Sequence, residues 1–108
     1  MATNRNRYQF PAVFSEVLVY QGTLDLGNAA TGSGTFASSD VTIAGAALGD
    51  FVIVSLGLDT VDTAVIGAVT AADTVTVTVL NNTAGAVNLA STTVRIAVLK
   101  PNSEVFYA

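Results

Sequence analysis

Thr74-Val75-Thr76-Val77-Thr78-Val79-Leu80 alternates strictly between threonine and valine as far as Val79, and this stretch decides the fold class. Successive side chains of a β-strand point to opposite faces, so the three valines share one face and the threonines share the other. A period of two is typical of a strand with one buried and one exposed face. We therefore expect a half-buried strand here, with its valines facing the core.

Further strands are expected on both sides of this segment. Residues 92–99 repeat the alternation, with Val94, Ile96 and Val98 facing inward, and Pro101 follows. Residues 51–56 (FVIVSL) are nearly continuously apolar, which is typical of a strand buried on both faces or at the centre of a sandwich. Shorter or weaker strand signals lie at residues 16–20, 35–37, 40–43 and 63–70, the last with Gly67 as a bulge or a point of close approach.

Several short strands separated by turn signals predict an all-β fold, a single-domain β-sandwich or barrel of jelly-roll-like type. The chain of 108 residues has the length of one domain. Its one helical candidate, residues 44–48, is far too short to be stable as a helix. We divide the chain into an extended N-terminal arm, residues 1–15, and a β domain, residues 16–108.

The arm differs in composition from the rest of the chain. It contains half of the positive charges, three aromatic residues and Pro11, which disfavours a helix. Such an arm either lies along a neighbouring subunit or folds back on its own domain. Because aromatic and arginine side chains are enriched at interface hot spots, we predict five contact residues. They are Arg5, Arg7, Tyr8, Phe10 and Phe14.

The chain is poor in charge. Only 11% of its residues are charged, where about 25% is usual for a soluble domain. Its surface is therefore either polar but uncharged or partly covered by partners, and we favour partners. A net charge of −4 argues against nucleic-acid binding, and no apolar run is long enough to span a membrane. The charged N-terminus is not followed by an apolar stretch, so we expect no secretory signal.

The chain offers little to catalysis. It has no His, Cys or Trp, which removes Ser-His and Cys-His nucleophile pairs and most transition-metal sites. We predict no enzymatic activity, no cofactor and no metal site. Asp59 and Asp62 could face a cation, but two carboxylates are too few for calcium, and a turn is the better interpretation. Residues 45–50 lack the lysine of a phosphate loop and are interpreted as a tight connection, and the sequon at 81–83 carries no meaning without a secretory signal.

The run at 41–54 (VTIAGAALGDFVIV), together with residues 75–82, 84–87 and 93–99, resembles a β module of small virion proteins from tailed bacteriophages. These are head decoration (cement) proteins and head-fibre domains. The resemblance spans roughly residues 24–100 and leaves the N-terminal arm uncovered. It implies a homotrimer on the outer surface of the virion head, bound to the major capsid protein and stabilising it without chemistry. The resemblance supplies no contact residues, and the expectation that the arm contacts a sister subunit or the capsid rests on its aromatic and arginine residues.

Two other functions remain open at this point. One is a tail, neck or fibre-base protein of the same kind of virion. The other is a carbohydrate- or host-receptor-binding module, which is less favoured because sugar sites usually use aromatic platforms and the chain has no Trp.

Overall fold

The Thr/Val segment forms the central strand of a three-stranded antiparallel sheet. The computed structural model describes residues 13–29, 35–60 and 62–106, and in them the chain forms two three-stranded sheets and one two-stranded ribbon. The strands are β1 (Phe14–Leu24), β2 (Asn28–Ala29), β3 (Thr35–Thr42), β4 (Phe51–Leu56), β5 (Ala64–Ala71), β6 (Thr74–Asn81), β7 (Val87–Asn88) and β8 (Thr92–Pro101). We call β1-β8-β4 sheet I and β3-β6-β5 sheet II.

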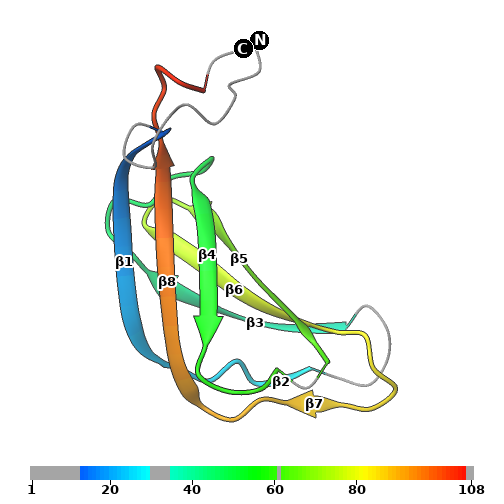
Figure 1. Cartoon of the computed structure of the whole chain (residues 1–108). Helices are drawn as coiled ribbons and strands as arrows, with labels where there is room; N and C mark the ends of the chain where they lie inside the picture. The colour runs from blue at the N-terminus through cyan, green and yellow to red at the C-terminus, as the bar shows by residue number, and fades with distance from the viewer. Residues whose placement is uncertain (1–12, 30–34, 61, 107–108) are drawn as a thin grey trace.

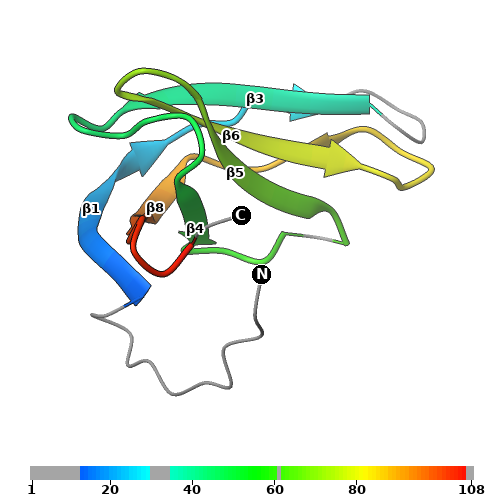
Figure 2. The same ribbon diagram turned by 90° about the horizontal axis from the view of Figure 1, so that it is seen from above.

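The two sheets pack face to face as a β-sandwich, which confirms the predicted fold class (Figures 1 and 2). Their strands cross at an angle, so that β3 and β6 run obliquely behind sheet I in Figure 1. The pairing is nested: β1 pairs with β8, β2 with β7 and β3 with β6, all antiparallel. This folded ribbon passes from one sheet to the other and is the jelly-roll-like feature of the topology. β4 then adds to the free edge of β8, and β5 to that of β6.

The core lies between the sheets and is centred on the inward residues of both central strands, with buried residues of β3, β5 and the loops around them. The largest fully buried side chains are Val75, Val77, Val79, Val94, Ile96, Val98 and the polar Asn81. Val52 and Val54 of β4 are half-buried and pack against this cluster. The predicted grouping of Val52, Val54, Val77 and Ile96 is therefore confirmed.

Gly67 brings the two sheets close together at one side of the sandwich. It lies on the inner face of β5, opposite β4, and its φ is not positive. A Cβ atom placed there would come within 2.9 Å of Val52 Cγ1 and closer still to a methyl of Val54. The predicted close approach is confirmed, and its physical reason is that two valines occupy the space a side chain would need.

Two strands are longer than the sequence predicted. Residues 35–37 and 40–43 were expected as separate strands, but β3 is continuous because it pairs with β6 from Thr35 to Thr42 without a break. β1 continues past Tyr20 to Leu24 because β8 supplies partners over that whole length. In both cases a long partner strand holds polar residues in extended conformation.

Residues 51–56 were expected to form a strand buried on both faces or at the centre of a sandwich, and the expectation of burial on both faces is wrong. β4 is an edge strand of sheet I, and its burial alternates along its length. Val52, Val54 and Leu56 face the core, whereas Phe51 and Ile53 are 46% and 58% exposed. The apolar residues on the outer side therefore have no partner within the core.

Candidate interaction surface

The outer face of sheet I presents three rows of side chains, each row with one residue from β1, β8 and β4. In that strand order the rows are Val17-Leu99-Phe51, Val19-Ala97-Ile53 and Gln21-Arg95-Ser55. We call the first two rows the apolar face and the third the polar row. Val19 is 78% exposed, the highest value among the large apolar residues of the described ranges. Leu99, in the middle of the first row, is only 6% exposed, so Val17 and Phe51 are the exposed residues of that row. The second row is exposed or half-buried from β1 to β4.

Three phenylalanines extend the apolar face at one end. The ring centroids of Phe14 and Phe51 are 5.6 Å apart and nearly perpendicular, and Phe106 lies 5.8 Å from Phe51 and 6.3 Å from Phe14. Such edge-to-face and tilted pairs stabilise one another beyond their simple area of contact. Phe106 is placed by a turn in which its N–H and that of Val105 donate to the Asn102 carbonyl. Residues from both ends of the described chain thus meet at this edge.

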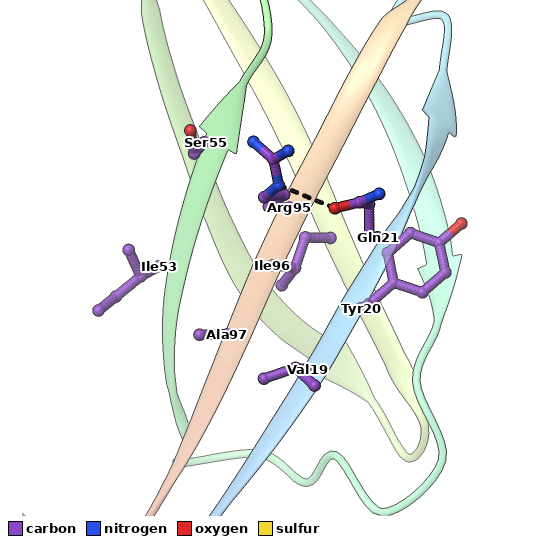
Figure 3. Close-up of a pocket in the computed structure, with 8 residues that line it drawn as sticks. All are labelled: Val19, Tyr20, Gln21, Ile53, Ser55, Arg95, Ile96 and Ala97. Carbon is purple, nitrogen blue, oxygen red and sulfur yellow. Dashed lines mark hydrogen bonds between the residues drawn. The ribbon is translucent and has the colours of Figure 1, made fainter.

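A shallow trough runs along β8 over the second row and the polar row (Figure 3). It arises because Ala97 is small and stands between the larger Val19 and Ile53 of the flanking strands. Its volume is about 400 Å³. At the polar row, Arg95 Nε donates a 2.8 Å hydrogen bond to Gln21 Oε1. The trough therefore has apolar walls and one charged group at its end.

The opposite outer face, on sheet II, is more polar. The predicted threonine face is present there, and Thr76 Oγ1 donates a 2.7 Å hydrogen bond to Asp40 Oδ1 and lies 2.8 Å from Thr70 Oγ1. Two large apolar side chains, Phe36 and Ile66, are exposed near one end of that sheet. Phe36 stands in an apolar row with Leu80 and Ala64, whereas Ser38 and Thr78 stand beside Ile66 in the next row.

The connection from β3 to β4 is fixed by hydrogen bonds to its own and neighbouring loops. Lys100 Nζ donates to Asp50 Oδ2 at 2.6 Å and to the Gly45 carbonyl at 2.8 Å. The Ala47 N–H donates to Asp50 Oδ2, and the Gly45 N–H donates to Asp73 Oδ1. Gly45 has a φ of 94°, which favours glycine. These contacts agree with the interpretation of residues 45–50 as a tight connection.

The other chemical signals of the sequence fall in turns. Asp62 has a φ of 61° and directly precedes Thr63, whose N–H donates to the Thr60 carbonyl. In residues 13–29, 35–60 and 62–106, no three His, Cys, Asp or Glu side chains gather where they could hold a metal ion. Asn81 of the sequon is fully buried, and its amide donates to the Gly85 carbonyl at 2.8 Å. Within the same described ranges, no helix is both long and apolar enough to cross a bilayer.

Four of the five predicted contact residues, Arg5, Arg7, Tyr8 and Phe10, lie outside the described residues. Phe14 is described, and it begins β1 and contacts two other phenylalanines of its own chain. It therefore sits at the end of the apolar face, and its contact with a partner stays a prediction. Sequence reasoning missed the apolar face itself. The signal was present as two apolar runs, 17–19 and 51–54, that exceed what one buried face needs.

Comparison of the chain with models of protein families, with curated proteins and with solved structures finds no match. A function for the chain therefore has to follow from its own residues.

Proposed function

We propose that this chain is a structural protein of a bacteriophage virion, a decoration (cement) protein that forms a homotrimer on the outer surface of the head. In this proposal it binds the major capsid protein and stabilises the shell without catalysis or a cofactor. The observation that carries the proposal is the apolar face of sheet I. It lies outside a core that is already complete between the sheets.

The chemistry of this face favours burial against protein. Val17, Val19, Phe51 and Ile53 are all more than 40% exposed. Removing apolar surface from water contributes about 25 cal/mol per Å², and Arg95 is the one charged residue in the three rows. The electrostatic cost of covering the face is therefore small. Contiguous exposed apolar area of this kind marks interaction sites in soluble proteins.

A trimer makes a specific demand on the subunit. Around a threefold axis each contact joins two different surfaces, because one subunit's front meets the next subunit's side. The apolar face supplies one such surface. The low charge of the whole chain supports extensive contact with partners, since charged residues are what normally keep small domains apart.

The proposal is tested by immunogold labelling of intact particles of the phage that encodes the chain. An antibody against the folded domain is expected to label the outside of the heads at many positions. Gold confined to the tail or neck would replace this proposal with a tail, neck or fibre-base protein. Unlabelled intact particles, with labelling of the purified chain as a control, would overturn a virion role.

A further inference from the structure

We infer that the connection between β3 and β4, residues 44–50, of one copy docks into the trough on sheet I of a second copy, with Leu48 against Ala97. The Asp73 carboxylate, which lies beside that connection, then pairs with Arg95 of the second copy. This inference rests on the self-association in the proposed function and names the part of the neighbouring copy that covers the trough. The two contacting surfaces differ, as a closed ring of subunits requires.

The connection presents one large apolar side chain at the tip of a tight turn. Leu48 is 71% exposed, and its neighbours Ala47 and Gly49 are exposed and small. The Asp50 N–H donates to the Ala47 carbonyl at 3.1 Å, and Gly49, with a φ of 98°, occupies the position at which such a turn favours glycine. Lys100 holds the base of the turn through Asp50. Because the backbone is already fixed, docking of Leu48 orders little else.

The trough carries a cation that has no acidic partner in its own chain. Arg95 is the one charged residue of the three rows, and in the part of the chain that the structure describes no carboxylate forms an ion pair with it. Its Nε donates to Gln21, which orients the guanidinium and leaves the terminal nitrogens for another acceptor. Paired terminal nitrogens of this kind bind a carboxylate with both of its oxygens. The trough therefore suits an apolar side chain that has a carboxylate close by.

Asp73 places such a carboxylate beside Leu48. Its N–H donates to the Ala46 carbonyl at 2.8 Å, and its Oδ1 accepts from the Gly45 N–H at 2.8 Å. Asp73 is exposed and thus accessible to a neighbouring copy. Ala46 and Leu48 are two residues apart, which is at most about 7 Å. The floor of the trough and its cation are also two residues apart along β8, again about 7 Å.

Other surfaces of a second copy fit the trough less well. The same face offers only another Arg95, so a twofold contact between two such faces would cover two guanidinium groups without a carboxylate. The outer face of sheet II carries Asp40, which already accepts from Thr76, and contact between opposite faces of a sandwich builds an open stack. Residues 44–50 lie instead at the end of the sandwich, where the chain passes from sheet II to sheet I (Figure 1).

The test uses engineered cysteines, because the chain has none of its own. Leu48→Cys is prepared as its mixed disulfide with thionitrobenzoate and is co-refolded from urea with Ala97→Cys. The thiolate introduced at position 97 attacks the disulfide, forms the inter-chain S–S bond and releases coloured thionitrobenzoate. Ala68→Cys is the matched control, since Ala68 faces outward from sheet II and is exposed. Circular dichroism checks that each variant is folded, and reaction with free dithiobis(nitrobenzoate) corrects for the reactivity of each thiol.

We expect the disulfide between positions 48 and 97 to form at least about tenfold faster than the one between positions 48 and 68, because docking raises the effective concentration of Leu48 at the trough. Equal corrected rates would overturn the inference. Light scattering on the same samples separates the two levels of the account. An intact oligomer with equal rates refutes the docking alone, whereas monomers throughout refute the proposed assembly as well.

The charge pair is tested on the same reaction. Asp73→Asn, placed in the chain that carries Leu48→Cys, keeps an oxygen acceptor for the Gly45 N–H and removes the charge. It should slow the reaction with position 97 by about two- to fivefold. Asp25→Asn is the matched control, since Asp25 is also exposed and accepts from the N–H of a nearby glycine, and it should leave the rate unchanged. Equal rates for the two variants would overturn the pairing of Asp73 with Arg95.

Discussion

Gly67→Ala should destabilise the domain, although it adds one methyl group to a strand. The new Cβ would lie 2.9 Å from Val52 Cγ1 and closer to Val54, well inside ordinary contact distance. Overpacking of this kind costs about 1–3 kcal/mol. Replacing glycine by alanine also returns about 0.4–1 kcal/mol by restricting the unfolded chain. The net loss in the free energy of unfolding is therefore about 1–2 kcal/mol.

The measurement is urea or thermal unfolding at one fixed protein concentration, because self-association makes the midpoint depend on concentration. For a chain of this size the expected fall in Tm is about 4–9 °C. Gly85→Ala is the matched control, since a Cβ at Gly85 meets no atom within 4 Å and its φ is not positive. That variant should be neutral or slightly more stable than the parent.

A double variant tests the mechanism of the effect. Val54→Ala removes the methyl nearest to the new Cβ, so Gly67→Ala/Val54→Ala should lose less stability than the two single changes added together. We expect a coupling of about 1 kcal/mol, which is within the range seen for residues in contact. Full additivity, or a Gly67→Ala variant as stable as the Gly85→Ala control, would refute the close packing of β4 against β5.

Three further changes probe the core and the loops, each followed by urea unfolding. Ile96→Ala should lower the free energy of unfolding by about 2–5 kcal/mol because Ile96 is fully buried. Thr76→Ala, on the exposed outer face of sheet II, should lower it by less than about 1 kcal/mol, and equal losses for the two variants would mean that the threonine face is covered. Lys100→Met should lower the free energy of unfolding by about 2–3 kcal/mol, because it leaves the Asp50 carboxylate, which is 7% exposed, without its cation. A loss under about 0.5 kcal/mol would contradict a stabilising role for this ion pair. Asn81→Ala should lower the free energy of unfolding by about 2–3 kcal/mol, because it removes the side-chain hydrogen bonds that close the turn after β6. A variant as stable as the parent would show that the turn forms without these hydrogen bonds.

The alternating segments could be predicted from the sequence because their information is local. The valines of β6 and the inward residues of β8 occupy the positions that a period of two assigns to them. The position of a strand within a sheet is not local. Residues 51–56 carry the strongest apolar signal of the chain, yet β4 lies at an edge because it pairs with β8 on one side and with no strand of the sheet on the other. No pattern within residues 51–56 reports that neighbour.

The apolar face could not be predicted for the same reason. Val19, Ala97 and Ile53 form one row, although they come from three segments separated by tens of residues, and only the register of both pairings brings them together. The charge deficit did indicate that part of the surface is covered, but composition cannot locate a surface. The two-residue strands β2 and β7 were also missed, since each is too short to show a period.

The mass of the particle in solution tests the central claim, that the outer face of sheet I is an assembly interface. Light scattering at micromolar concentration should give about 33 kDa for the parent chain, three times its 11.0 kDa. Ile53→Glu should reduce the mass to that of a monomer, and Ile66→Glu, a similarly exposed isoleucine on the outer face of sheet II, should leave it unchanged. A parent chain that is monomeric, or an Ile53→Glu variant that keeps the full mass, would contradict the account.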